Sequence, residues 1–257
     1  MVIGPALGGA IYLIGAAAAY AFCVVSFVSV TVAISMLHAR GAVTSLETGA
    51  STLVRLTAGV RYVRTRPIIL GAISLDLFAV LLGGATALLP IYARDILHSG
   101  PTGLGMLRSA PALGAAATGL MLGRMPLERN TGRVMFACVG LFGLATIVFG
   151  LSRSFALSLS ALAVLGAADM VSVYVRSTLI QLATPDAMRG RVSAVNSLFI
   201  GASNELGEFE SGVTAAWFGT VPSVVIGGAG TIVVVAVWMG LFPELREVDR
   251  ISDVMPA

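Results

Sequence analysis

The sequence predicts an all-α integral membrane protein built as a polytopic helical bundle. Of its 257 residues, 57% are hydrophobic and 11% are charged, against about 45–50% and about 25% in soluble domains. Apolar runs long enough to cross a bilayer recur along the whole chain. All 16 basic residues are arginine, and most of them lie between those runs. A conventional water-soluble globule is therefore excluded.

The apolar runs give the order of the predicted helices. A helix that crosses the hydrocarbon core needs about 20 mostly apolar residues. The chain begins with a short run at 1–15, which is too short to span comfortably. Seven full runs follow, at 17–37, 68–93, 101–123, 133–151, 155–181, 191–217 and 221–242. Short connections separate them, apart from the segment 38–67.

The arginines predict how the helices are oriented. Arginine in short loops is retained on the cytoplasmic side of the membrane. With 38–67 and the C-terminal tail placed there, that side holds Arg40, Arg55, Arg61, Arg64, Arg66, Arg124, Arg129, Arg133, Arg189, Arg191, Arg246 and Arg250. The other side receives only Arg94, Arg108 and Arg153. This asymmetry predicts a cytoplasmic C-terminus.

The long connection 38–67 contains a predicted amphipathic helix. Its apolar stripe repeats at i, i+3, i+7 and i+10, through Leu53, Leu56, Val60 and Val63. Its arginines lie off that stripe. The pattern favours a helix at the membrane surface, serving either as a linker packed against headgroups or as a regulatory site. Pro67 then opens the next run, at a helix position where a missing N–H costs nothing.

Several kinds of chemistry are excluded by composition. The lack of lysine removes a Walker-type phosphate loop and a Schiff-base cofactor site. His38 and His98 flank runs that place them on opposite sides of the bilayer, so they cannot share a metal ion. Cys23 and Cys138 lie in apolar runs, where thiols usually act as small hydrophobes. We expect no enzyme activity, cofactor, metal site or nucleic-acid partner.

Three motifs resemble a known family of transporters. Gly4-Pro5-Ala6-Leu7-Gly8-Gly9 resembles the G-P-x-x-G-G motif in the fifth helix of exporters of the major facilitator superfamily. Gly123-Arg124 and Arg129-Asn130-Thr131-Gly132-Arg133 are similar to the second copy of that family's signature loop, without the usual acidic residue before the arginine. Thr184-Pro185-Asp186-Ala187-Met188-Arg189-Gly190-Arg191-Val192 resembles the P-x-x-x-R-G-R-V turn before the eleventh helix in the branch related to enterobactin exporters.

The resemblance implies a domain organisation. Family members have about twelve helices in two halves that rock around a central site. Residues 1–37 would then be the end of the N-terminal half, 38–67 a cytoplasmic linker, 68–242 the C-terminal six-helix bundle and 243–257 a cytoplasmic tail. The chain would cover the last seven and a half of twelve helices and looks cut from something longer. The resemblance makes Gly4, Pro5, Gly8 and Gly9 a helix-packing motif, and Arg124, Arg129, Arg133, Arg189 and Arg191 gating-loop candidates.

Charged residues inside the predicted spans mark the candidate transport pathway. Each one facing lipid would cost roughly 2.5–3.5 kcal/mol, so they must face water, pair with one another or be protonated. The residues are Asp76, Asp169, Arg176, Glu205, Glu208 and Glu210. The runs 17–37, 133–151 and 221–242 carry none between their ends. In the resembled fold these three are the peripheral helices, and the charged runs border the cavity.

Two helical faces group the charged residues. Gly201, Asn204, Glu205, Glu208, Ser211 and Gly212 share one face of the run 191–217, with Glu210 about 140° from Glu205. Asp169, Ser172 and Arg176 line up on the run 155–181, and Arg176 matches Asp76 in depth. We expect Glu205 or Glu208, or less strongly Asp169, to bind and release a proton. The alternative is a hydrogen-bonded packing seam. The G-x-x-x-G pairs Gly4/Gly8 and Gly119/Gly123 are expected to let helices approach closely.

The predicted function is secondary transport by a fragment: proton-coupled export of a small amphipathic solute, such as a siderophore or drug, across a bacterial inner membrane. The expected partners are the lipid bilayer, the small-molecule substrate, the proton and the missing N-terminal half. The alternative is a truncated, non-transporting membrane protein that associates with or regulates an intact transporter. An intramembrane enzyme is not expected, because no H-E-x-x-H or G-x-G-D sequence is present and no Ser/His pair shares a span.

Overall fold

The computed structural model of the chain describes residues 11, 15–36 and 52–250. These residues form helices and connections, with no strand among them. In chain order the elements are α2 (Ala16–Met36), α3 (Thr52–Arg64), α4 (Pro67–Leu82), η1 (Ala85–Leu88), α5 (Leu89–Ile91), η2 (Tyr92–Ile96), α6 (Gly100–Arg124), α7 (Thr131–Leu151), α8 (Phe155–Ala183), α9 (Asp186–Phe218), α10 (Thr220–Leu241) and α11 (Pro243–Arg246). The predicted all-α fold is confirmed.

Each of the seven full apolar runs contains a helix, and four of these helices are long and apolar enough to cross a membrane. The four segments are Pro67–Ile96, Thr131–Leu151, Phe155–Ala183 and Thr220–Leu241. The apolar part of α2, Tyr20–Met36, is shorter. Helices α6 and α9 have the required length, but glycines and Arg108 lower the hydropathy of α6 and glutamates that of α9. Most of the run 1–15, including Gly4, Pro5, Gly8 and Gly9, lies outside the described residues, as do His38 and Arg40.

The span predicted at 68–93 corresponds to the membrane-crossing segment Pro67–Ile96, but its first α-helix ends at Leu82. Gly83 and Gly84 interrupt it, and the chain continues as short 3-10, α- and π-helical turns to Ile96. A Cβ on Gly84 would lie 2.5 Å from the Ser211 hydroxyl and 2.7 Å from the Gly207 carbonyl oxygen. The glycine pair therefore allows the interruption to lie directly against α9.

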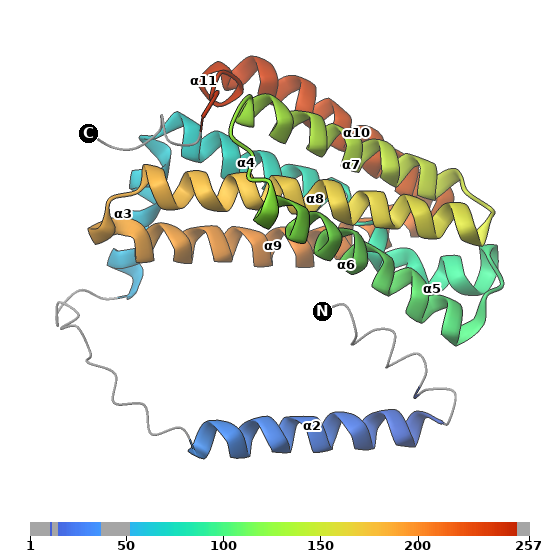
Figure 1. Cartoon of the computed structure of the whole chain (residues 1–257). Coiled ribbons are helices and arrows are strands. Elements are labelled where there is room, and N and C mark those ends of the chain that lie inside the picture. The colour runs from blue at the N-terminus through green and yellow to red at the C-terminus, as the bar shows by residue number, and fades with distance from the viewer. Residues whose placement is uncertain (1–10, 12–14, 37–51, 251–257) are drawn as a thin grey trace.

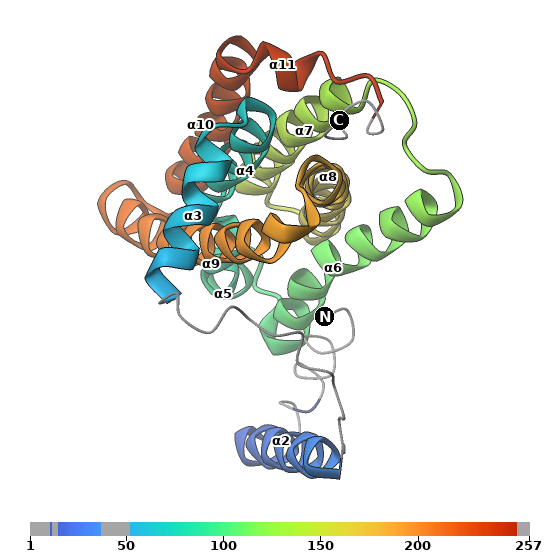
Figure 2. The same ribbon diagram turned by 90° about the vertical axis from the view of Figure 1, so that its left-hand side faces the viewer.

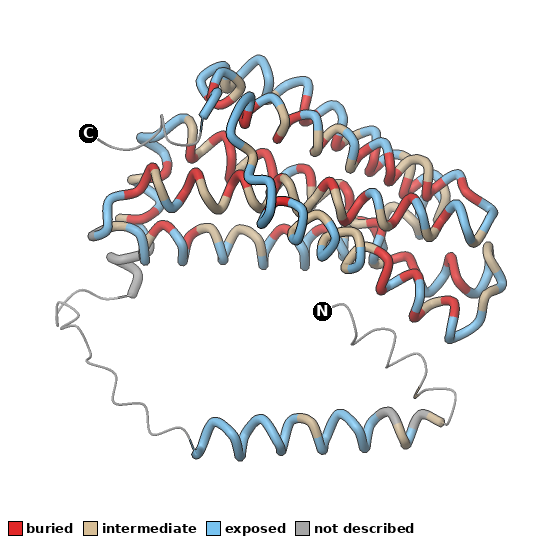
Figure 3. The backbone as a smooth tube through the Cα atoms, in the orientation of Figure 1, coloured by how far each residue is buried: buried red, intermediate tan, exposed pale blue. Residues whose placement is uncertain are grey.

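The long helices lie side by side in one bundle (Figure 1). Going around it, α6 packs on α8, α8 on α7, α7 on α10, α10 on α4 and α4 on α9. Buried residues line the facing sides of these helices, whereas α2 lies apart from the bundle and is mostly exposed (Figure 3). The largest buried cluster joins α4, α7, α8 and α10 through residues such as Leu75, Phe136 and Leu179. This core holds α4 and α8 in position.

The closest helix crossing is that of α6 and α8. A Cβ on Gly114 would collide with the Ala163 carbonyl oxygen, and one on Gly166 with the backbone of Pro111. The pair Gly119/Gly123 of α6, which was expected to pack closely, makes no such close approach. A Cβ on Gly119 would make only ordinary contact with Met170, at 3.4 Å, and Gly123 has open space around it. The prediction of a close Gly119/Gly123 approach is therefore wrong, because those residues lie on a looser part of the helix.

Helix α3 exists as predicted, but its apolar side packs on protein. A Cβ on Gly59 would lie 2.8 Å from the Arg191 carbonyl oxygen, Val63 is buried, and the Tyr62 hydroxyl donates a hydrogen bond to the Ala183 carbonyl at 3.1 Å. Val60, expected on the same stripe, is exposed. The helix lies across one end of the bundle (Figures 1 and 2). Its buried side is thus covered by the start of α9 and the end of α8 rather than by headgroups.

The arginines separate to the two ends of the bundle. Because successive long helices alternate in direction, the end of α6 and the starts of α7 and α9 lie at the end that α3 covers (Figure 1). This end carries Arg61, Arg64, Arg66, Arg124, Arg129, Arg133, Arg189, Arg191 and Arg246. Arg94 and Arg153 lie at the opposite end. Such a distribution is typical of membrane proteins that follow the positive-inside rule.

Candidate functional site

A buried ion pair joins α4 to α8 in the interior of the bundle. The Arg176 guanidinium of α8 contacts the Asp76 carboxylate of α4, and their side chains are 4% and 7% exposed. The pairing expected from their depth along the two helices is present. An unpaired charge in a membrane interior is expensive, and such pairs commonly mark functional pathways. This pair is therefore the centre of the candidate site.

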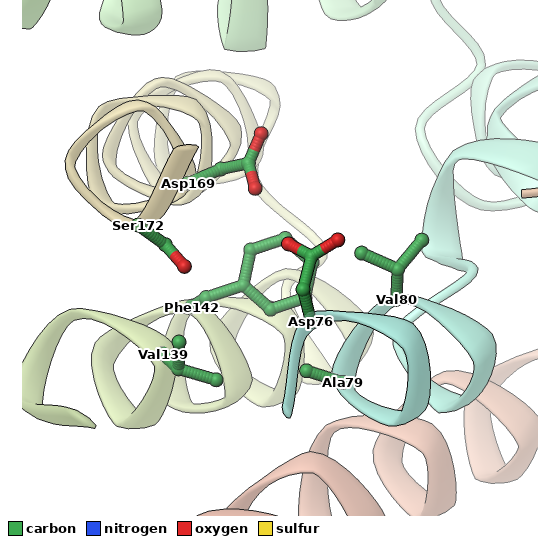
Figure 4. Close-up of a pocket in the computed structure, with 7 residues that line it drawn as sticks. All are labelled: Asp76, Ala79, Val80, Val139, Phe142, Asp169 and Ser172. Atoms are coloured by element: carbon green, nitrogen blue, oxygen red, sulfur yellow. The ribbon is translucent and has the colours of Figure 1, made fainter. Parts of the chain in front are cut away.

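The ion pair borders a small cavity with two further polar groups. Asp169 and Ser172 of α8 and Asp76 of α4 point into the space between the two helices, where Phe142 of α7 closes one side (Figure 4). The cavity has a volume of about 10 Å³, which is room for about one water molecule. It places two carboxylates and a hydroxyl around one small space.

The polar groups of this cavity are incompletely paired. Among the described residues, the Ser172 hydroxyl and the Arg176 Nε have no hydrogen-bond partner. Within the same part of the chain, Asp169 forms no ion pair. Two carboxylates, Asp76 and Asp169, thus line one cavity, and only Asp76 is paired with Arg176. The gain or loss of a proton at Asp169 changes the charge of this cavity.

The other acidic residues lie elsewhere, on the exposed side of α9. Asn204, Glu205 and Glu208 are exposed, and Glu210 is half-buried. The Thr214 hydroxyl donates a hydrogen bond of 2.9 Å to the Glu210 backbone carbonyl. The structure does not bring Glu205 or Glu208 together with the Asp76–Arg176 pair. The described chain therefore holds two separate polar groups of residues.

Helix α9 has three distinct faces. Its buried face carries Ser203, Gly207 and Ser211, and Ser223 donates a hydrogen bond to the Ser211 carbonyl at 3.2 Å. The exposed polar face carries Asn204, Glu205 and Glu208. The third face is apolar and also exposed, with Leu198, Leu206 and Phe209. Ser211 therefore belongs to a packing seam, as the alternative interpretation expected, whereas the two glutamates do not.

The connection between α6 and α7 is fixed by the C-terminal tail. The backbone N–H of Asn130 donates to the Asp249 carboxylate at 2.8 Å, and the Thr131 N–H donates to the Asp249 carbonyl at 3.1 Å. The Gly132 N–H donates to the Val248 carbonyl at 3.0 Å. These bonds satisfy donors that the first turn of a helix otherwise leaves free. Sequence reasoning missed Asp249, because no local pattern signals a contact across 119 positions.

The gating-loop candidates lie close to this contact or at the start of α9. Arg124, Arg129 and Arg133 are exposed. Arg189 forms an ion pair of 2.8 Å with Asp186, and Arg191 donates to the Met188 sulfur at 3.6 Å. Their gating role stays a prediction. Within the described ranges, no group of three His, Cys, Asp or Glu side chains is arranged to hold a metal ion.

Apolar helices with a buried interhelical ion pair define a polytopic membrane protein with an internal polar site. Residues 1–256 match the family described as transmembrane secretion effector. The chain belongs to this family of efflux transporters of the major facilitator superfamily.

Similar proteins include the enterobactin exporter EntS of Citrobacter koseri, which is 30% identical over 195 residues, 76% of this chain and 46% of that protein. EntS of Escherichia coli SMS-3-5 is 27% identical over 206 residues, 80% of this chain and 49% of that protein. The chain thus spans about half the length of these curated relatives. No solved structure matches it.

Proposed function

We propose that this chain forms the C-terminal half of a secondary export transporter in a bacterial inner membrane, with its arginine-rich end and its C-terminus in the cytoplasm. The observation that carries the proposal is the buried Asp76–Arg176 pair with Asp169 beside it, inside a bundle of an efflux family. Ionisable groups inside a membrane bundle are expensive and mark transport pathways. The activity proposed is movement of a solute rather than catalysis.

The solute we propose is small and amphipathic, such as a siderophore or drug. The polar face of α9, with Asn204, Glu205 and Glu208, adjoins an apolar face with Leu206 and Phe209. A surface of this kind suits a ligand with both polar and apolar parts. The relatives are named as exporters of enterobactin, which is in keeping with this class of solute.

Export is proposed to be coupled to proton entry. Glu205 and Glu208 lie three residues apart, about one turn, on the same exposed face as Asn204, so a bound solute and a proton could compete for the same carboxylates. Asp169 is the second candidate, because it lines the buried cavity beside Asp76 and forms no ion pair within the described residues. In both cases the proton changes the charge that the pathway presents to the solute.

Replacing Glu205 and Glu208 by glutamine in this chain, reconstituted with the N-terminal half of a relative, is expected to lower proton-driven efflux about tenfold or more. The reason is that glutamine keeps the size of the side chain but carries no titratable proton. The measurement is solute efflux from proteoliposomes with an imposed pH gradient, alongside solute exchange without a gradient. Solute exchange without a gradient should continue in the double variant. The matched change at the Glu210 position should leave both rates near wild type, and unchanged proton-driven efflux in the double variant would remove this role.

The chain on its own is expected to show no saturable solute flux. Family members move solute between two halves, and this chain spans about half the length of its relatives. The measurement compares proteoliposomes holding this polypeptide with liposomes that also hold the N-terminal half of a relative. Flux only in the second preparation supports the half-transporter. Saturable, gradient-dependent flux in the first would contradict it, and no flux in either would favour the alternative of a non-transporting protein that associates with an intact transporter.

A further inference from the structure

Two arginines of α3 remain exposed beside the first membrane-crossing helix. Arg61 and Arg64 lie on the side of α3 opposite Gly59 and Val63, which pack on the bundle. Within residues 52–250, neither arginine forms an ion pair. Arg189, at the same end of the bundle, is by contrast paired with Asp186 at 2.8 Å. Within this part of the chain, both guanidinium groups are therefore unpaired and exposed.

The surroundings of these arginines combine hydroxyl groups with apolar atoms. One shallow groove runs between α3 and the start of α9 and is lined by Arg61, Tyr62, Thr65 and Met188, among others. An adjoining one is lined by Val60, Arg61, Arg64 and Thr65. Arg61 and Thr65, one helical turn apart, line both. Guanidinium groups bind phosphate oxygens through two parallel hydrogen bonds, and the methionine and valine side chains offer apolar contact next to them.

The position of these two adjoining grooves, which together form the α3 groove, points to a lipid rather than to a soluble anion. Helix α3 lies across the end of the bundle (Figure 2), and Thr65 and Arg66 lead directly into α4 at Pro67. The segment Pro67–Ile96 is one of the four that are long and apolar enough to cross the membrane. Arg61 and Arg64 are therefore within two turns of the start of a spanning helix, at the level expected for phospholipid headgroups.

We propose that Arg61 and Arg64, beside Thr65, form a binding site for the phosphate of an anionic phospholipid. The α3 groove holds the headgroup, and the apolar side chains of Val60 and Met188 contact the part of the lipid next to it. The lipid thereby fixes α3 to the membrane surface on its exposed side, while its buried side is fixed to α9. This site is independent of the solute pathway.

The test measures lipid binding to the purified full chain in neutral detergent, with phosphatidylglycerol, phosphatidylcholine or inorganic phosphate as the probe. We expect Arg61→Gln with Arg64→Gln to weaken phosphatidylglycerol binding roughly 30-fold, because each basic residue near a membrane surface contributes about fivefold in affinity. Both side chains are exposed, so the thermal unfolding temperature without lipid should not change. The matched control is Arg129→Gln with Arg133→Gln, which removes the same charge from exposed residues at the same end, near the α6–α7 connection (Figure 2).

Retained phosphatidylglycerol binding in the α3 variant, or an equal loss in the control variant, would overturn the proposed site. Equal binding of phosphatidylcholine would show that negative charge is not recognised. Equal binding of inorganic phosphate would show a soluble-anion site in its place. The proposal requires that phosphatidylglycerol binds and that the other two probes do not compete with it at the same concentration. It also requires that only the α3 variant loses phosphatidylglycerol binding.

Discussion

Replacing Arg176 by methionine is expected to lower the free energy of unfolding by about 3–5 kcal/mol, because it leaves the Asp76 carboxylate buried without its partner. Methionine has a similar length and fills much of the same space. The loss therefore reports the unpaired charge rather than a cavity. The measurement is thermal and denaturant-induced unfolding of the purified protein in detergent.

Two further variants test whether the loss of stability comes from the unpaired buried charge or from the change of side chain itself. Changing Asp76 to leucine together with Arg176 to methionine removes both charges and is expected to restore most of the stability, since apolar replacements of a buried pair are often neutral. Replacing Arg189 by glutamine breaks the exposed pair with Asp186 and should cost less than about 1 kcal/mol. If Arg176→Met unfolds no more easily than Arg189→Gln, the buried pair contributes nothing to stability.

The secondary structure and the ion pair followed from the sequence because both depend on distances along single helices. Apolar runs of about 20 residues can be recognised without knowing what they contact. Asp76 and Arg176 lie at similar distances from the arginine-rich ends of their helices, so counting residues predicted that they would meet. Asp76 is the one charged residue of α4, and α8 carries only Asp169 and Arg176, which left little choice of partner.

The contacts between helices were predicted less well, because periodicity defines the faces of a helix and not its neighbours. The apolar stripe predicted on α3 was assigned to headgroups, whereas the side of α3 that carries Gly59 and Val63 packs on α9 and α8. The Asp249 contact with Asn130 joins residues that no local motif relates. In the candidate site, Asp169 lies beside Asp76 whereas Glu205 and Glu208 are exposed, a distinction that depends on which way α8 and α9 face.

The positions of tight glycine packing show the same limit. A spacing of four residues suggested that Gly119 and Gly123 allow α6 to approach a neighbour. The backbones in fact come closest at Gly114 and Gly166, which lie on opposite sides of the α6–α8 crossing. The collision partner at each of these two is backbone, namely the carbonyl of Ala163 and the main chain of Pro111. A spacing rule cannot separate these cases, since it contains no information on the second helix.

Replacing Gly166 by valine is expected to destabilise the protein by about 3 kcal/mol, at the upper end of the usual cost of overpacking. Its Cβ would overlap the carbonyl group of Pro111, and backbone cannot turn aside as a flexible side chain does. The α6–α8 crossing would have to widen along its length. Thermal unfolding in detergent measures the cost, and proteolysis in the α6–α7 connection reports separation of α6 from the bundle.

The control is Gly123→Ala, at a position in α6 where an added Cβ meets nothing within 4 Å. Alanine removes the backbone freedom of glycine, so this change should leave stability unchanged or raise it by up to about 1 kcal/mol. Gly166→Ala completes the comparison, because it adds the same single methyl group at the crossing. Loss of stability in Gly123→Ala but not in Gly166→Ala would mean that the four-residue spacing had identified the packing face correctly and that α6 and α8 cross elsewhere. The opposite result places the crossing at Gly166 and Pro111, with Gly123 away from it.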